Sequence, residues 1–201
     1  MYKLYNFPPS GNCYKVRLLL NQLQLPFELI DVNIVSGDTH LPDFLQKNPN
    51  GKVPLLELEP DVLLTESNAI LIYLAEGTDL LPSDRLVRTK VMQWLFFEQY
   101  SLGANLSRPR FWMKIAKQSE QFAQIIEYHH RLGTVALKVM EQHLEKHLFF
   151  VSDRYTIADI ALFAYTHIAD EGGFDLSIFP ALQAWIKRIQ TQPNYCPIAQ
   201  S

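Results

Sequence analysis

The chain has 201 residues, 48% of them hydrophobic, and a formal net charge of −3 at pH 7. This length allows one large domain or two small ones, and the composition supports a substantial core. Neither charge sign forms a long run, which argues against nucleic acid as the main partner. We find no signal-like apolar region at the start and no apolar run long enough for a bilayer, so we expect no membrane association. Two distant cysteines, Cys13 and Cys196, form no disulfide framework, which indicates a reducing cytoplasm.

The first 77 residues alternate strand and helix patterns, separated by turn residues. A strand, a crossover helix and a second strand make a βαβ unit, in which the two strands are parallel. The whole order, β-α-β-α-β-β-α, matches a thioredoxin-like α/β domain. The expected elements are a strand at 3–7, a helix from Cys13, a strand at 27–32, a short helix around 43–46, strands at 55–58 and 62–64, and a helix from Glu66-Ser67 to Gly77.

The remainder of the chain, after a linker from Gly77 to Pro82, shows only helical patterns. We therefore divide the chain into an α/β domain over residues 1–77 and an all-α domain over residues 83–201. Thr156-Ile157-Ala158-Asp159 fits a capping box in its aspartate form, whose role is folding. The expected helices are one capped by Ser83 that runs through Leu102, one from Ser119 to Leu148 after a break at Arg108-Pro109, one from the capping box through Ile168, and one from Phe179 to Gln190.

The stretch from Asn48 to Leu74 contains two features that bear on ligand binding. The Val53-Pro54 bond, just ahead of a strand, is a candidate cis peptide. Glu66-Ser67 opens a helix, and the first turn of a helix has unpaired N–H groups and the positive end of the helix dipole. This helix start can therefore hold a ligand carboxylate, with the Ser67 hydroxyl as an additional donor.

A second candidate site lies in the loop between the first strand and the first helix. Ser10 stands at the amino end of that helix, where a hydroxyl donor and the helix dipole together stabilise a thiolate and lower its pKa. A serine in this role donates a hydrogen bond and does not attack, so it needs no base. The position alone is also compatible with a plain turn residue.

The stretches KVPLLELE and LLTESNAILIYLA resemble the glutathione S-transferase family, and the resemblance extends over essentially the whole chain. The segment SGNCYKVR, from Ser10 to Arg17, is similar to the bacterial serine-type classes, whether theta-, zeta- or nu-like. The resemblance implies the glutathione transferase fold, a thioredoxin-like N-terminal domain followed by an all-α C-terminal domain. It also implies a homodimeric detoxification enzyme that uses glutathione as co-substrate, without a metal, and adds its thiolate to a small-molecule electrophile.

The resemblance also assigns the residues that bind the reactive half of glutathione. Ser10 and Asn12 correspond to the groups that hydrogen-bond the glutathione sulfur, which makes them the expected catalytic residues. Glu66 corresponds to the partner of the γ-glutamyl ammonium, and Ser67 to a donor to the γ-glutamyl carboxylate. A tyrosine replaces the serine in other classes of the family, but here Tyr5 lies inside the strand pattern and we expect it in the core.

The other half of glutathione is assigned in the same way. Val53, beside Pro54, corresponds to the residue whose backbone pairs with the cysteinyl amide. His40 and Lys52 are candidates for the glycine carboxylate. Thr39 is the alternative to His40, because the spacing in this region differs by a residue between classes. Lys52 fits a solvated turn equally well.

The second substrate is expected between the domains. Four aromatic or polar residues near the end of the first long helix and after it are its candidate walls: Tyr100, Asn105, Phe111 and Trp112. An aromatic pattern with helical spacing also fits a packed core.

Two other patterns have both a chemical and a structural interpretation. Cys13 follows Ser10 at the spacing of the thioredoxin-like Cys-x-x-Cys and could form a mixed disulfide with glutathione, but we favour a small packed residue. His143 and His147 have a spacing that can bind a metal. Because the surrounding HLEKH lacks the metalloprotease order, we favour a solvated helix face.

Two other functions are compatible with the sequence. The reaction could be disulfide reduction, which Asn12 slightly favours, or isomerisation, although the zeta Ser-Ser-Cys pattern is absent. The fold could also serve as a binding module without turnover. The joint presence of Ser10, Val53-Pro54 and Glu66-Ser67 argues against that last reading.

Overall fold

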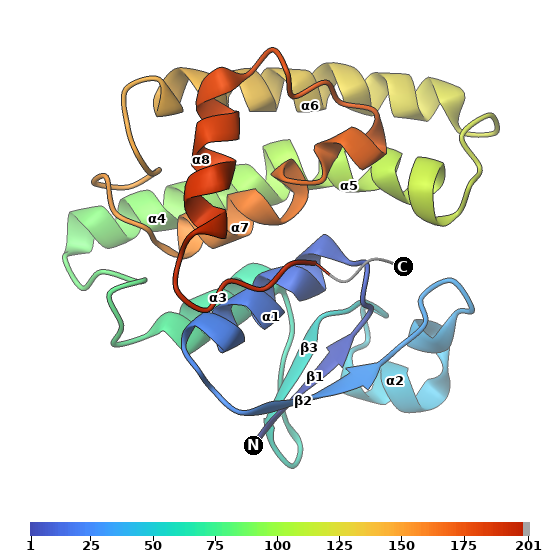
Figure 1. Ribbon diagram of the computed structural model, residues 1–201. Helices are drawn as coiled ribbons and strands as arrows, with labels where there is room; N and C mark the ends of the chain where they lie inside the picture. Colours follow the sequence, from blue (N-terminus) through green and yellow to red (C-terminus); the bar gives the residue numbers. More distant parts are fainter. Residues whose placement is uncertain (199–201) are drawn as a thin grey trace. The chain divides into compact units, whose positions relative to one another are not determined.

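The structure is a computed structural model that describes residues 1–198 and divides the chain into two compact units. The first unit contains residues 1–76 together with the segment 193–198, and the second is Gly77–Gln192. A mixed sheet with helices in the first unit and helices in the second confirm the predicted fold class (Figure 1).

The first unit has the predicted order of strands and helices. A short 3₁₀ turn, η1 (Asp38–His40), is the one addition between the helices and strands that the sequence indicated. The elements are β1 (Tyr2–Asn6), α1 (Gly11–Gln22), β2 (Phe27–Asp31), α2 (Pro42–Lys47), β3 (Leu55–Glu59), β4 (Val62–Leu64) and α3 (Ser67–Ala75).

The pairing of the four strands places several loops at one edge of the sheet. The strand order is β2-β1-β3-β4, with β1 and β2 parallel and the other two pairs antiparallel. Tyr5 pairs with Leu55, and Leu56 pairs with Leu64. The ends of β1, β2 and β4 therefore lie at the same edge as the start of β3, and the segments that enter or leave there are close in space.

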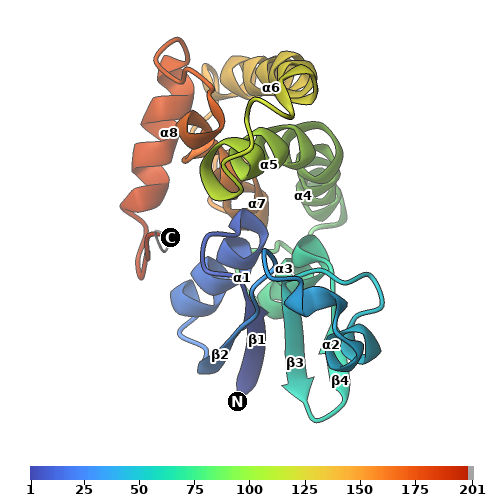
Figure 2. The same cartoon turned by 90° about the vertical axis from the view of Figure 1, so that its right-hand side faces the viewer.

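The two faces of the sheet are covered by different helices. Figures 1 and 2 show α1 and α3 together, with α2 apart from them. Phe44 of α2 joins Val32 and Leu55 in one buried cluster. Tyr5 packs against that cluster, as predicted for a core residue, and its hydroxyl donates to Glu57 at 3.0 Å. Because side chains alternate along a strand, the neighbours Leu4 and Leu56 face the other side of the sheet and are fully buried there.

The segment 193–198 returns to the first unit, whereas the predicted boundary assigned it to the helical domain. Tyr14 of α1 donates its hydroxyl hydrogen to the Cys196 carbonyl at 2.7 Å. Asn21, from the same helix, lies 3.3 Å from the Cys196 sulfur. The segment is held by polar contacts and shows no periodic pattern of hydrophobic residues, so the sequence alone did not indicate where it packs.

The second unit begins with a helical run that continues where the sequence suggested a break. Pro109 lies inside α5, and π-helical stretches stand on both sides of that helix. The wider π turns relax the hydrogen-bond register beside a proline, which itself has no N–H to donate. The run consists of α4 (Arg85–Phe97), η2 (Glu98–Gly103), α5 (Ala104–Arg110) and η3 (Phe111–Ile115).

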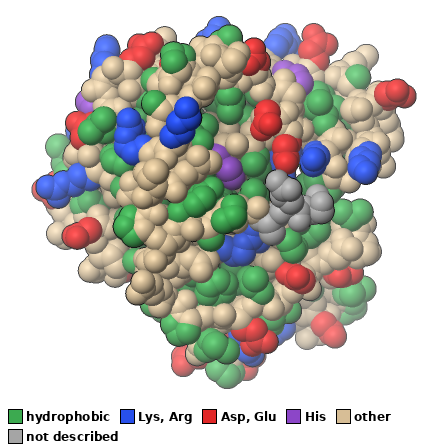
Figure 3. Space-filling view, in the orientation of Figure 1, with side chains coloured by type: hydrophobic (Ala, Val, Ile, Leu, Met, Phe, Trp, Pro, Cys, Tyr) green, Lys and Arg blue, Asp and Glu red, His purple; other side chains and the backbone are tan. Residues whose placement is uncertain are grey.

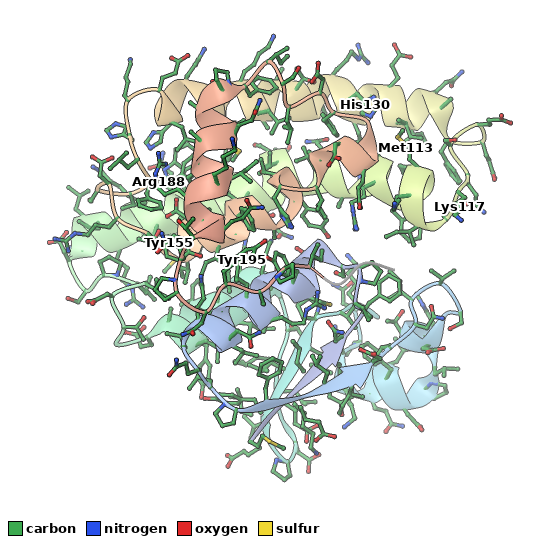
Figure 4. All side chains as sticks on the ribbon, viewed as in Figure 1. Met113, Lys117, His130, Tyr155, Arg188 and Tyr195 are labelled. Carbon is green, nitrogen blue, oxygen red and sulfur yellow. The ribbon has the colours of Figure 1, made fainter. Side chains whose placement is uncertain are left out.

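Two other boundaries differ from the sequence reading. The N-cap of α4 is Asp84, whose carboxylate accepts the Val87 N–H at 2.9 Å, and not Ser83. The second long helix, α6 (Ala123–Leu144), is shorter at both ends than predicted. The remaining elements are α7 (Ile157–Thr166), η4 (Ala169–Gly172) and α8 (Pro180–Gln190). Arg188 of α8, labelled in Figure 4, donates to the Leu148 carbonyl beyond α6 at 2.7 Å.

The capping box at the start of α7 is confirmed. The Asp159 carboxylate accepts the backbone N–H groups of Thr156 at 2.9 Å and Phe150 at 3.2 Å, and the indole N–H of Trp185 at 3.0 Å. Burial raises the pKa of Asp159 to about 6. One buried carboxylate thus fixes α7, α8 and the loop before α7 to one another.

Three further observations concern residues 1–198. In residues 1–198, no helix combines the length and apolar character needed to cross a membrane. On the face drawn in Figure 3, basic and acidic side chains are interspersed. His143 stacks on Phe150 and on His147, and the described residues contain no cluster of three or more metal-binding side chains.

His167 directly follows α7 and is largely buried. Its Nδ1 lies 2.8 Å from the Phe163 carbonyl, and the two rings stack with centroids 4.2 Å apart. Burial lowers the pKa of His167 from its ordinary value of 6.5 to about 4. The unfolded chain therefore binds a proton near pH 6 that the folded chain excludes.

We predict that this histidine weakens the fold in acid. The contribution of His167 to the free energy of unfolding falls as the pH drops from 6.5 towards 4, because over that range this histidine gains its proton only in the unfolded state. Between neutral pH and about pH 4.5, the unmodified protein should lose roughly 2 kcal/mol more than His167→Gln. Urea unfolding of both proteins at the two pH values measures the difference, and equal losses would contradict it.

Candidate functional site

Ser10 is the N-cap of α1. Its Oγ accepts the Cys13 N–H at 3.3 Å, and its backbone is extended at φ −73° and ψ 123°. A hydroxyl that accepts through a lone pair keeps its hydrogen for another partner. Ser10 is half-buried, so it can present that hydrogen to a ligand at the positive end of the helix.

The loop before Ser10 is anchored by a buried arginine. Arg17 donates to the Asn6 side-chain oxygen and, at 2.8 Å, to the Pro8 carbonyl. Asn6 in turn donates to Asp31 at 2.8 Å. These bonds tie the end of β1 to the end of β2 and to α1, and so fix the direction in which the chain reaches Ser10.

Cys13 is placed as a packed residue. It is fully buried, and its sulfur accepts the Phe7 N–H at 3.4 Å. Burial raises the pKa of the Cys13 thiol, which disfavours the thiolate needed for disulfide exchange. The geometry therefore supports the structural interpretation of this cysteine.

The start of α3 has an unusual backbone. Glu66 is the N-cap, at φ 64° and ψ 109°, a region that non-glycine residues rarely occupy. Such a residue costs on the order of 1–3 kcal/mol and persists only where the surrounding structure holds it. Glu66 is exposed, whereas Ser67 is buried at 5% exposure. Strain of this kind is concentrated at binding sites.

A hydrogen-bonded chain connects the two helix starts. The Lys15 ammonium lies 3.3 Å from the Ser67 hydroxyl and 3.3 Å from the Asn68 side-chain oxygen. The Ser67 hydroxyl donates in turn to the Asn12 side-chain oxygen at 3.4 Å. The structure thus brings Ser10, Asn12 and the Glu66-Ser67 turn to one edge of the sheet. Sequence reasoning missed Lys15, although an internal lysine on an apolar helix face was a visible signal.

The His40 ring lies beside the glycine turn that leads into Lys52. Gly51 has φ +61°, and a Cβ built on it would lie 3.5 Å from the His40 Nε2. Lys52 follows directly and is exposed, as is His40. Thr39 is only 2% exposed, so the geometry favours His40 over Thr39 as a ligand-binding residue.

The Val53-Pro54 peptide bond is cis, as the sequence suggested. Val53 precedes β3, which begins at Leu55, so its backbone groups lie outside the ladders that β3 forms with β1 and β4. Val53 enters the sheet at the edge where the Ser10 loop leaves it, because Tyr5 pairs with Leu55.

The predicted second-substrate residues are only partly brought together. Tyr100 and Asn105 line a groove of about 770 Å³ in the helical unit, together with Arg108, Tyr128 and His129. Phe111 and Trp112 are not among its lining residues, and Trp112 stacks on Phe122 at 4.8 Å instead. Tyr128, Leu132, Val135 and Val139 all line this groove, and their helical spacing in α6 was the sequence signal for it.

A polar triad lies inside this groove. His129 is 5% exposed, and its Nδ1 lies 2.8 Å from the Asn105 oxygen. That oxygen can only accept, so Nδ1 carries the hydrogen and Nε2 accepts from Arg108, which lies 3.4 Å away. Burial and the nearby Arg108 charge lower the pKa of His129, which keeps the ring neutral.

Comparison with known proteins gives family matches in both units. Residues 1–76 match the glutathione S-transferase N-terminal domain, and residues 108–193 match the C-terminal domain. A glutathione S-transferase structure from Pseudomonas fluorescens is 49% identical, has a TM-score of 0.96, and covers 99% of each chain.

Two other relatives bear on the chemistry. The disulfide-bond oxidoreductase YfcG of Escherichia coli is 32% identical over 96% of this chain and 92% of its own. A glutathione transferase from Burkholderia graminis, solved with two glutathione molecules bound per subunit, is 30% identical with a TM-score of 0.83 over 96% of this chain and 85% of its own. With both domains matched in order along the chain, the protein belongs to the glutathione S-transferase family.

Proposed function

We propose that this protein binds glutathione in its first unit, stabilises the thiolate with Ser10 and Asn12, and transfers it to a small-molecule electrophile. One observation supports this most strongly. A hydroxyl donor at the start of α1 and a strained helix start at Glu66 are joined at one sheet edge through the 3.4 Å contact between Ser67 and Asn12. A thiolate and a carboxylate of one ligand can occupy these two helix starts together.

The assignment of glutathione follows the geometry along the sheet edge. The γ-glutamyl carboxylate takes the N–H groups of α3, the backbone N–H of Ser67 among them, because the Ser67 hydroxyl hydrogen is donated to Asn12. The ammonium takes the Glu66 carboxylate. The backbone of Val53, beside Pro54, pairs with the cysteinyl amide. His40 and Lys52 hold the glycine carboxylate.

The chemistry needs no protein nucleophile. The thiol proton leaves to solvent, and the thiolate, held by the Ser10 hydroxyl and the α1 dipole, attacks the electrophilic carbon. A carbon–sulfur bond forms as the leaving group departs or as an activated double bond takes up a proton. The proposed electrophile contacts are Tyr100 and Asn105, because Phe111 and Trp112 do not line the same groove.

We further propose a cytoplasmic homodimer that acts in detoxification. Apolar side chains exposed on the helical unit outside the groove, such as Phe96 at 74% and Leu86 at 64%, support an apolar interface. Cys13 and Cys196 are both free thiols, which suits a reducing compartment. Phe96→Arg should then shift the mass measured by light scattering from dimer to monomer.

Disulfide reduction is the second candidate, favoured by the relationship to YfcG and by the two glutathiones bound to the Burkholderia graminis relative. One glutathione thiolate attacks a disulfide sulfur, releasing one thiolate and forming a mixed disulfide. The second glutathione resolves that bond. Two glutathione thiols are oxidised to one glutathione disulfide, and the substrate disulfide is reduced to two thiols.

We predict that Ser10→Ala lowers glutathione-dependent turnover roughly ten- to hundredfold at neutral pH, because the thiolate loses a donor. The pH profile of kcat/KM should move upward. Ser10→Thr keeps the hydroxyl and is the matched control that retains activity. Because Ser10 also caps α1, thermal unfolding is measured in parallel. An unchanged rate and profile for Ser10→Ala would exclude this assignment.

The strained backbone and the carboxylate of Glu66 give separate predictions, one for stability and one for glutathione affinity. Glu66→Gly relieves the positive φ, whereas Glu66→Ala keeps it, so the glycine variant should be more stable by about 1 kcal/mol. Both variants lose the carboxylate and should bind reduced glutathione roughly tenfold more weakly. Denaturant unfolding and calorimetric titration test the two halves separately. Equal stabilities would refute the strain, and unchanged affinities would remove Glu66 from the site.

The choice between reactions is tested by binding and turnover together. We expect saturable calorimetric binding of reduced glutathione and turnover of a chloro-aromatic acceptor. Tighter binding of oxidised glutathione, with turnover of a model disulfide, would favour the reductase. No binding of either form would leave the fold as a binding module.

A further inference from the structure

Lys15 is a fully buried lysine in the middle of the proposed site. It lies in α1, one turn beyond Asn12, with 0% exposure. Its ammonium contacts the Ser67 hydroxyl and the Asn68 oxygen, both at 3.3 Å. Lysine is almost never fully buried, because removing its charge from water is costly. Both neighbours offer oxygen lone pairs, so the Lys15 ammonium donates to each of them.

The donors and acceptors of Lys15, Ser67 and Asn12 fix the direction of the hydrogen bonds that connect them. An ammonium only donates, so the Ser67 oxygen accepts from Lys15 and its hydrogen must point elsewhere. The Asn12 oxygen lies 3.4 Å from that hydroxyl and receives this hydrogen. An amide that accepts through its oxygen turns its NH₂ group away from the hydroxyl. The Asn12 NH₂ is therefore left to donate to another group, and it is the proposed second donor to the thiolate.

We infer that Lys15 is a positioning residue for the thiolate, which acts through Ser67 to fix the orientation of the Asn12 amide. The inference rests on the proposed function. It adds a physical link between the two ends of the ligand: Ser67 offers its backbone N–H to the γ-glutamyl carboxylate, and its hydroxyl orients a donor to the sulfur. Lys15 reaches neither the sulfur nor the electrophile in this scheme.

Without the Lys15 ammonium, the direction of the hydrogen bond between Ser67 and Asn12 is no longer fixed. Without Lys15, the Ser67 hydroxyl can turn towards the vacated side, and the Asn12 amide is free to rotate. An amide oxygen facing a thiolate repels it, whereas an NH₂ group stabilises it. The affinity for the thiolate form should therefore fall more than the affinity for the thiol form.

The test is Lys15→Met, which keeps the length of the side chain and removes its donors. The pKa of bound glutathione is read from the ultraviolet absorbance of the thiolate during a pH titration, alongside the pH profile of kcat/KM. We expect both to move upward by about one unit, equivalent to a tenfold loss of thiolate at neutral pH. In an Asn12→Ala background, Lys15→Met should produce no further shift, because the amide it orients is absent.

A control separates positioning from loss of packing. Asn21→Ala removes polar contacts from the same helix, away from the site, and should lower the melting temperature without moving the thiol pKa. If Lys15→Met does not fold, Ser67→Ala breaks the same chain at its next link and is expected to shift the pKa in the same direction.

Three results would be decisive against the proposals. A folded Lys15→Met with an unchanged thiol pKa overturns the inference, and so does a shift that adds fully to that of Asn12→Ala. Both leave the proposed function standing. Failure of the unmodified protein to bind glutathione, or to lower its thiol pKa, overturns the proposed function and this inference with it.

Discussion

The register of the four-stranded sheet is the constraint on which the site depends. Because β1 and β3 are antiparallel and pair Tyr5 with Leu55, the chain must leave β1 where it enters β3. The β3–β4 pairing then brings the Glu66 turn to the same edge. A shift of one residue in either pairing would turn every side chain to the opposite face and expose the buried cluster around Phe44. Burial of that core therefore holds three distant loops in one place.

The same edge concentrates costs that a purely structural protein would avoid. The backbone of Glu66 is strained, and the side chain of Lys15 is fully buried. The strain at Glu66 alone costs on the order of 1–3 kcal/mol, a considerable fraction of the free energy of unfolding of a typical domain. The capping box at Asp159 and the apolar core of α7 stabilise the helical unit.

The sequence predicted the fold, the cis bond and the capping box because each had a local signal. The cis bond at Val53-Pro54 and the capping box depend on neighbours within a few residues. The continuation of the helix through Pro109 did not follow, because π turns that relax the register have no clear residue signature. The return of the segment around Cys196 and the Lys15 chain depend on contacts between distant segments, which a single sequence does not encode locally.

Thiolate stabilisation alone cannot decide the reaction. In the proposed mechanism, Ser10 and the α1 dipole stabilise the same anion whether its next partner is a carbon or a sulfur. The direction of chemistry must therefore come from what the other reactant meets. A groove with a neutral His129 held between Asn105 and Arg108 offers fixed donors and acceptors rather than a plain apolar wall. Arg108 is exposed and has more N–H donors than its contact with His129 uses, so this groove should favour a reactant that carries an acceptor, such as a carboxylate.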